Sequence, residues 1–223
     1  MPELPVIAVI GGAGAEGSGL AVRWAKAGYR VLIGSRSPER AAAKAAELNA
    51  LIGGRNLEGR DNRAAAEAAA IVVLTVPYAA QLSTLGELKP ALGGKILVDV
   101  TVPLVPPRVA RVQLPEGGAA VEIAQRMLGP EVKVVSAFQN VSAHHLMDLA
   151  HDVDCDVLVC GDDKDAREVV VGLARAIGLR GLHAGALANS AAAEALTSLL
   201  VFMNRHYKSP GAGIRITGLP DAD

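Results

Sequence analysis

The chain has 223 residues, of which 51% are hydrophobic and 20% are charged, and its formal net charge at pH 7 is -1. This composition excludes a disordered protein, which would have fewer apolar residues and more charge. The near balance of 22 basic and 23 acidic side chains argues against a nucleic-acid or membrane-surface partner, because such partners attract an excess of Lys and Arg. The sequence shows no signal peptide and no strongly apolar run of about twenty residues, so we expect a cytoplasmic protein without a membrane partner.

The first forty residues follow the pattern of a dinucleotide-binding strand, turn and helix. An apolar run at 6–10 leads into Gly12, Gly14 and Gly17, which fit the spacing G-x-G-x-x-G, and an alanine-rich helical pattern follows to residue 27. The first glycine allows a tight turn, the second lets a pyrophosphate approach the backbone, and the third lets helix and strand pack closely. The helix N-terminus offers free N–H groups and a positive dipole end to the anion.

The second predicted strand, at 29–33, ends in residues that favour NADP over NAD. An NAD site has an acidic residue here to hold the ribose 2′-hydroxyl, whereas this chain has Ser35 and Arg36, with Arg40 one helical turn further on. Arg36 can donate to a 2′-phosphate through its planar guanidinium, and the acid that would repel the phosphate is missing. A capped helix start would explain the Ser-Pro pair that follows, but not two arginines in place of the acid.

Helix and strand patterns alternate through the rest of the chain, which predicts an α/β fold of the doubly wound Rossmann type with a mostly parallel sheet. The strand candidates are continuous apolar runs, as expected for a sheet covered on both faces. The expected order is helix 38–50, a glycine-rich connection through residue 59, helix 62–70, strand 71–76, helix 78–88, strand 95–100, helix 121–128, strand 132–137, strand 156–160, helix 165–177, strand 179–183 and helix 190–203. We expect an NADP-binding Rossmann domain over 1–140 and a small C-terminal α/β extension over 141–223 that ends in an apolar helix.

Ligands of such sheets bind beyond the carboxyl ends of the strands. This rule places Val76 and Pro77, residues 101–103 and residues 136–140 along the nicotinamide half of the cofactor, with Pro77 as a wall residue. The histidines and aspartates between residues 144 and 165 match no metal-ligand spacing, and no nucleophile–base pair or Tyr-x-x-x-Lys pair is present. We therefore expect no metal and no catalytic side chain, because hydride transfer to a cofactor can rely on geometry alone.

Several of these segments together resemble the NADPH-dependent coenzyme F420 reductases, over nearly the whole chain. The similar segments are Ile10-Gly11-Gly12-x-Gly14, Gly34-Ser35-Arg36, Leu74-Thr75-Val76-Pro77, Pro103-Leu104-Val105-Pro106, Val134-Val135-Ser136-Ala137, Val159-Cys160-Gly161-Asp162-Asp163 and Asn189-Ser190. The Cys-Gly-Asp-Asp and Asn-Ser segments have no role in generic dinucleotide binding and are therefore the more specific part. The resemblance implies reversible hydride transfer between nicotinamide C4 of NADP(H) and C5 of the 8-hydroxy-5-deazaflavin coenzyme F420, which would be a second substrate.

The resemblance also implies positions for the binding site. It places the pyrophosphate loop on Ala13, Gly14, Ala15 and Glu16, the 2′-phosphate contacts on Ser35, Arg36 and Arg40, and the nicotinamide and deazaflavin walls near Val76, Ala80, Val102 and Ala143. Two positions depart from the family. Many relatives have Thr at position 13, and some have His and Pro where this chain has Gln139 and Ser142, so no imidazole role is assumed there.

The C-terminal part is expected to bind coenzyme F420 and to form a homodimer. Candidate substrate-binding residues are Gln139, Asn140, Asn189, Arg205 and Lys208. Coenzyme F420 has an anionic tail of a phosphodiester and glutamate, and the basic C-terminal residues, including Arg215, could hold it, although a solvated basic chain end would look the same. The nearly uncharged helix at 190–203 is more apolar than a surface helix should be, which favours a dimer.

Two other functions fit the same dinucleotide pattern. One is an NADP-dependent imine, pyrroline or metal-ion reductase, although pyrroline-type enzymes usually have a longer helical C-terminal domain than this chain can hold. The other is a redox sensor that binds NADP without turnover, since its Rossmann site would look identical.

Overall fold

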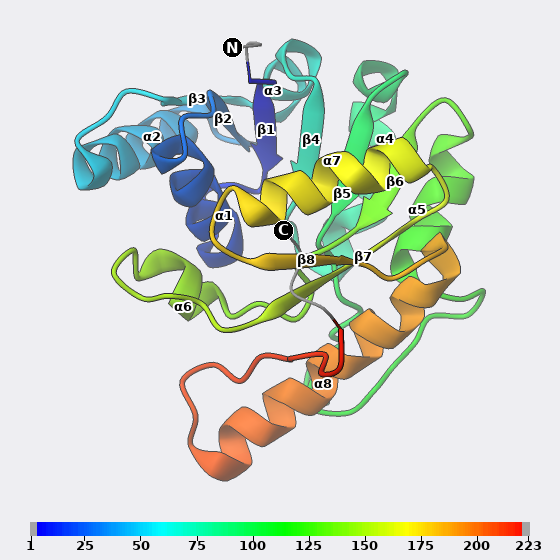
Figure 1. The fold of residues 1–223 in the computed structure, drawn as a ribbon. Helices are drawn as coiled ribbons and strands as arrows, with labels where there is room; N and C mark the ends of the chain where they lie inside the picture. Colours follow the sequence, from blue (N-terminus) through cyan, green and yellow to red (C-terminus); the bar gives the residue numbers. More distant parts are fainter. Residues whose placement is uncertain (1–3, 220–223) are drawn as a thin grey trace.

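The computed structural model describes residues 4–219, which form a three-layer α/β structure around one sheet (Figure 1). The eight strands lie in the order β3-β2-β1-β4-β5-β6-β7-β8. Their bounds are β1 Ile7–Ile10, β2 Val31–Ser35, β3 Leu57–Asp61, β4 Ile71–Leu74, β5 Ile96–Asp99, β6 Lys133–Ser136, β7 Asp156–Gly161 and β8 Arg180–His183. Every pairing is parallel except that between β6 and β7. The predicted Rossmann-type, mostly parallel sheet is thus confirmed.

Helices cover both faces of the sheet, which explains why the central strands are apolar on both sides. The helices are α1 Ala15–Lys26, α2 Pro38–Ile52, α3 Asn62–Ala68, α4 Tyr78–Leu92, α5 Ala120–Leu128, α6 Ala143–Met147, α7 Lys164–Arg175 and α8 Ser190–Tyr207, with a 3-10 turn at Leu187–Asn189. Side chains of α1, α2, α6 and α7 share one buried core with the sheet, and those of α3, α4 and α5 share the other. In Figure 1, α8 lies beyond the sheet at the lower end of the molecule.

The segment around Gly59 differs from the expectation. The predicted connection is instead the edge strand β3, which pairs with β2 from Leu57 to Asp61. Only Leu57 of this strand is buried, and its charged residues hide it from a search for continuous apolar runs. Gly59 is required there, because a Cβ atom at this position would collide with the backbone of Ala41 and Ala42 in α2.

Three helices also differ from the sequence pattern. The last of them, α8, continues to Tyr207, beyond the predicted end at residue 203. The helix that begins at Tyr78 continues to Leu92, beyond the predicted end at residue 88, and contains Pro90 in its last turn. Pro90 lacks the N–H that would bond the Gly86 carbonyl, and the helix ends two residues later at Leu92. The remaining difference is α6, a short helix that was not predicted because its sequence has no periodic apolar pattern.

The C-terminal part extends the same sheet. β7 joins the edge of β6, and β8 pairs with β7. The buried Asp156 carboxylate then holds the chain end, because it accepts hydrogen bonds from both Nε and Nη2 of Arg180 and from the backbone N of Ile216 at 2.6 Å. These donors hold the pKa of Asp156 below its ordinary value. A boundary at residue 140 falls between β6 and α6, and the functional division into two parts stays a prediction.

Within residues 4–219, no helix combines the length and the apolar character needed to span a membrane. Nor does that part of the chain bring three or more His, Cys, Asp or Glu side chains close enough together to hold a metal ion.

Candidate functional site

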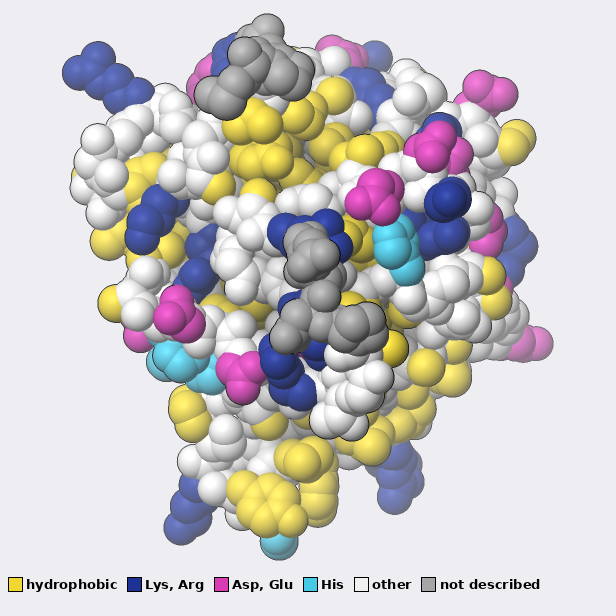
Figure 2. Space-filling model, viewed as in Figure 1, with side chains coloured by type: hydrophobic (Ala, Val, Ile, Leu, Met, Phe, Trp, Pro, Cys, Tyr) yellow, Lys and Arg dark blue, Asp and Glu magenta, His cyan; other side chains and the backbone are white. Residues whose placement is uncertain are grey.

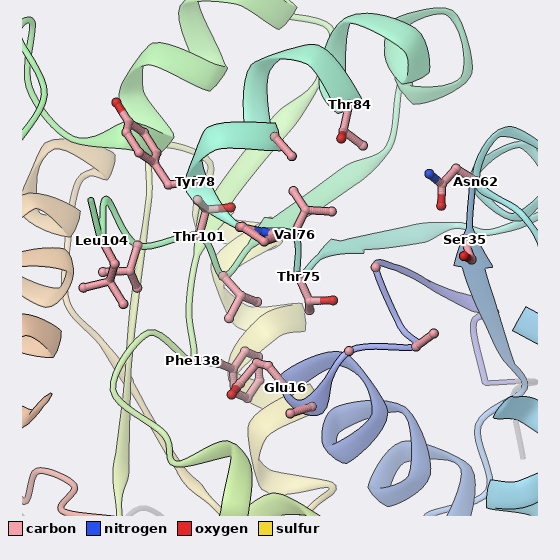
Figure 3. Close-up of a pocket in the computed structure, with 18 of the residues that line it drawn as sticks. Glu16, Ser35, Asn62, Thr75, Val76, Tyr78, Thr84, Thr101, Leu104 and Phe138 are labelled. Atoms are coloured by element: carbon pink, nitrogen blue, oxygen red, sulfur yellow. The ribbon is translucent and has the colours of Figure 1, made fainter. Parts of the chain in front are cut away.

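A cavity of about 740 Å³ opens at the carboxyl ends of the central strands. Its lining comes from the segments that follow β1, β2, β4, β5 and β6, together with Asn62 and with Thr197 of α8. Figure 3 shows that Ser35 and Asn62 lie at one end, whereas Tyr78 and Leu104 lie at the other. The cavity is therefore elongated along the sheet edge, as a dinucleotide requires.

The turn between β1 and α1 forms the floor of this cavity. Gly11, Ala13, Gly14, Ala15 and Glu16 all line it. The first N–H groups of a helix have no partner within the helix, so they can bind an anion in the cavity.

The other two glycines of the motif, Gly12 and Gly17, are buried and do not line the cavity. A Cβ atom on Gly17 would lie 2.5 Å from Thr75 Oγ1 and 2.7 Å from Gly12 Cα. These two positions therefore determine how closely α1 packs on β1 and β4, and the exposed Gly14 keeps the path along the backbone open.

Ser35, Arg36 and Arg40 line the end of the cavity next to β2. Both arginines are exposed, and neither makes an ion pair in the part of the chain that the structure describes. Ser37 caps α2 by accepting a hydrogen bond from Arg40 N, so the helix start holds the Arg40 backbone in place. Two guanidinium groups without carboxylate partners give this end a positive charge that suits a phosphate.

The opposite half of the cavity is mostly apolar. The predicted wall residues Val76, Pro77, Ala80 and Val102 line it, and Ala143 lies outside the lining. Leu104, Phe138 and Val141 line the cavity as well, and of these Phe138 belongs to the segment 136–140 that was predicted to lie along the nicotinamide half. A flat aromatic ring could stack between such walls and exclude water.

A buried polar network stands behind this apolar half. The fully buried Asp99 carboxylate accepts hydrogen bonds from Gln81 Nε2 at 2.6 Å and from Thr101 N at 2.9 Å. Gln139 Nε2 donates to the Asp99 carbonyl and to Ser136 Oγ, each at 2.8 Å. Burial raises the pKa of Asp99 above its ordinary value. Gln139 therefore lines the cavity with its amide nitrogen already engaged in the wall.

The other four candidate substrate-binding residues lie outside the cavity lining. Asn140 Nδ2 donates to Ala193 O at 2.8 Å, so this side chain fastens α8 to the loop after β6. Asn189 Nδ2 donates to Ala184 O at 2.7 Å. Arg205 and Lys208 are exposed near the end of α8, where Lys208 is the left-handed C-cap residue with φ 54°.

The strained backbone of Phe138 and the unsatisfied oxygen of Asn62 are visible only in the structure. Phe138 has a φ of 71°, a strained value for an aromatic residue, and its ring meets Trp24 of α1 edge-on with centroids 5.7 Å apart. Asn62 lies across from Ser35, and its buried Oδ1 atom makes no hydrogen bond within residues 4–219. This oxygen is therefore free to accept a hydrogen bond from a ligand in the cavity. A single sequence carries no signal for either feature.

Known proteins with similar sequences match this chain over almost its full length. The family model of coenzyme F420-dependent NADP oxidoreductases matches residues 6–103. The F420-dependent NADP reductase of Methanocaldococcus jannaschii is 44% identical over 221 residues, which cover 96% of this chain and 98% of the relative. The chain belongs to the F420-dependent NADP reductase family. The enzyme of that name from Methanothermobacter thermautotrophicus is 43% identical over 225 residues and 97% of each chain.

A solved structure shows the same fold. A protein of Arthrobacter sp. FB24, described as a candidate F420-dependent NADP reductase, matches with a TM-score of 0.81 at 24% identity. The match covers 96% of this chain and 100% of the other.

The two arginines at the end of β2 provide a test of NADP selectivity. We expect Arg36→Ala to weaken NADPH binding by about 1.5–3 kcal/mol, because one charge-assisted donor to the 2′-phosphate is lost. NADH binding should stay nearly constant, since NADH has no such phosphate. Titration calorimetry with both cofactors measures this difference, and Arg63→Ala, which removes an exposed arginine outside the cavity lining, is the control. Equal weakening of NADPH and NADH would contradict the assignment.

Proposed function

We propose that this protein transfers a hydride reversibly between nicotinamide C4 of NADP(H) and C5 of coenzyme F420. The main support is the 44% identity to an F420-dependent NADP reductase over 96% of this chain and 98% of that enzyme. The cavity fits this reaction, because it joins a phosphate-binding end to an apolar half that can hold two stacked rings. Coenzyme F420 is a second substrate in this proposal, and the protein needs no resident prosthetic group.

The residues of the chain act by binding and alignment. The backbone N–H groups of the turn at 11–16 hold the pyrophosphate, and Arg36 and Arg40 hold the 2′-phosphate. Val76, Val102 and Leu104 bound the apolar half and exclude water from the reacting rings. Holding two reactants in contact supplies most of what such a transfer needs, because the cofactors carry the chemistry themselves.

Absorbance tests the proposed reaction directly. When the protein is mixed with NADPH and oxidised coenzyme F420, the absorption band of the oxidised deazaflavin should decrease, and excess NADP⁺ should restore it. NADH should support the change much more weakly. Binding of NADPH without any absorbance change would contradict the proposal and favour a non-catalytic NADP sensor or a reductase of another substrate, such as an imine.

We also propose that Arg205 and Lys208 contribute to a site for the anionic tail of coenzyme F420. Arg205 lines a second cavity of about 360 Å³ together with Arg108 and Arg111, and none of these three arginines makes an ion pair within residues 4–219. Most residues that line this second cavity come from 107–111, just after Val102 and Leu104, which line the first cavity. Arg215 differs, because its guanidinium already lies 3.3 Å from Asp154 and 3.4 Å from Asp156.

Replacing Arg205 and Lys208 by alanine tests this tail site. We expect the KM for coenzyme F420 to rise several-fold at low ionic strength and its salt dependence to flatten, because charge attraction between exposed groups is screened by salt. The KM for NADPH should be unchanged. A matched double variant, Arg55→Ala with Arg63→Ala, removes two exposed charges elsewhere. An unchanged KM for coenzyme F420 would show that these residues are only solvated surface.

The exposed face of α8 supports the proposal of a homodimer. Leu199, Phe202, Met203 and Tyr207 are 47%, 55%, 42% and 70% exposed. Figure 2 shows hydrophobic side chains gathered at the lower end of the molecule, where α8 lies. Apolar side chains grouped in this way mark protein interfaces.

A charge placed in this face should prevent dimerisation. We expect Phe202→Glu to convert a dimer to a monomer in sedimentation velocity experiments, because burying a carboxylate in an apolar interface is unfavourable. Val169→Glu, which changes an exposed apolar residue of α7, is the control. A wild-type protein that sediments as a monomer would contradict the proposal.

A further inference from the structure

Glu16 is a half-buried carboxyl group in the cavity wall, at the second position of α1. Its Oε1 atom is buried and makes no hydrogen bond with any described residue. A polar atom that is removed from water without a partner is unfavourable, and the protein's own fold offers nothing to satisfy it. The geometry therefore points to a ligand group as the missing partner.

Glu16 lies toward the end of the cavity opposite the arginines. Phe138, from the loop after β6, packs against Trp24 of the same helix, so this loop lies next to α1. Figure 3 shows Glu16 and Phe138 in one region of the cavity, while Ser35 and Asn62 lie at the far end. A dinucleotide whose 2′-phosphate meets the arginines must extend its nicotinamide past the glycine turn, toward Glu16 and Phe138.

None of the described charged or titratable groups near Glu16 is its partner. Arg36 after β2, Arg40 of α2, and Tyr78 and Glu87 of α4 line the same cavity, and His144 and His145 belong to α6, which packs on α1. Glu16 makes neither a hydrogen bond nor an ion pair with any of these six groups. Burial alone raises the pKa of Glu16 to about 8.

We propose that Glu16 is a charge partner of the nicotinamide ring, so that the preference of the protein for NADP⁺ over NADPH increases with pH. The nicotinamide ring is positively charged in NADP⁺ and neutral in NADPH. An ionised Glu16 stabilises the charged ring, whereas a protonated Glu16 fits the neutral ring. Because binding and ionisation are linked, NADP⁺ must lower the pKa of Glu16 as much as ionisation strengthens NADP⁺ binding.

The direction of the pH dependence follows from the raised pKa. Below about pH 8 the free protein has a protonated Glu16, so NADP⁺ binding displaces that proton into solvent. Above this pH the carboxylate is already charged, so it attracts the positive ring of NADP⁺, whereas the neutral ring of NADPH offers it no such partner. The ratio Kd(NADPH)/Kd(NADP⁺) should therefore rise with pH, by about tenfold for each unit by which the pKa values of the two complexes differ.

The ratio of the two dissociation constants isolates the ring charge. NADP⁺ and NADPH have the same pyrophosphate and the same 2′-phosphate, so the titration of these groups and of the arginines cancels. We would measure both constants by titration calorimetry from about pH 6.5 to about pH 9.5, the range around the raised pKa. The proteins are wild type, Glu16→Gln, and Glu87→Gln as a control that removes the other acidic group of the cavity lining.

The expected result is a ratio that rises with pH in wild type and in Glu87→Gln but stays flat in Glu16→Gln. Wild-type titrations in two buffers of different ionisation enthalpy should also show a proton released with NADP⁺ and not with NADPH. This second measurement needs no variant, so it decides the proposal even if Glu16→Gln does not fold. A flat wild-type ratio without proton release would overturn it.

The inference rests on the dinucleotide binding of the proposed function, but its test does not use coenzyme F420. Binding of both dinucleotides without pH dependence would overturn the role of Glu16 alone. Binding of neither dinucleotide would overturn the proposed function as well.

Discussion

The tight packing between the start of α1 and the ends of β1 and β4 determines the candidate site. Thr75 Oγ1 donates to the Ile10 carbonyl at 2.9 Å, and Ser18 Oγ donates to the Gly12 carbonyl at 2.9 Å. Gly17 fits between these groups only because it has no Cβ atom. The first turn of α1 is thereby fixed as the floor of the cavity, so its backbone N–H groups are available without rearrangement when an anion binds.

The C-terminal part depends on the Rossmann core through buried polar contacts. Glu194 of α8 is buried and accepts hydrogen bonds from Ala120 N at 2.8 Å and Val121 N at 3.2 Å, at the start of α5. Burial raises the pKa of Glu194 to about 7 even though these two bonds favour the ionised form. Thr197 Oγ1 donates to the Gln139 carbonyl at 2.8 Å and also lines the cavity. The helix that presents the apolar surface is therefore fixed to the same loop that forms the cavity wall.

The parts of the fold that could be predicted from sequence are those governed by local chemistry. Buried parallel strands are continuous apolar runs, and the glycine turn and the arginines after β2 have fixed spacings, so one sequence suffices for them. The edge strand β3 was not predicted, because Glu58 and Arg60 interrupt its apolar pattern. Features that involve distant segments could not be predicted either. Examples are the ion pair of Arg215 with Asp156 and the absence of a partner for the Asn62 oxygen within the described residues. Such features depend on the folded arrangement and leave no mark in local composition.

The polar groups around the apolar half of the cavity explain why alignment is the main contribution of the protein. Asp99, Gln81 and Gln139 are buried and bind one another or the backbone, so they hold the wall in place and are poorly suited to exchange a proton with a ligand. Thr101 faces the same half, and its buried hydroxyl makes no hydrogen bond within the described chain. The amide nitrogens of Gln81 and Gln139 are already engaged within this wall, so the two side chains are held in place before the rings enter. Hydride transfer requires this kind of site, in which distance and dryness are controlled and the cofactors supply the reactivity.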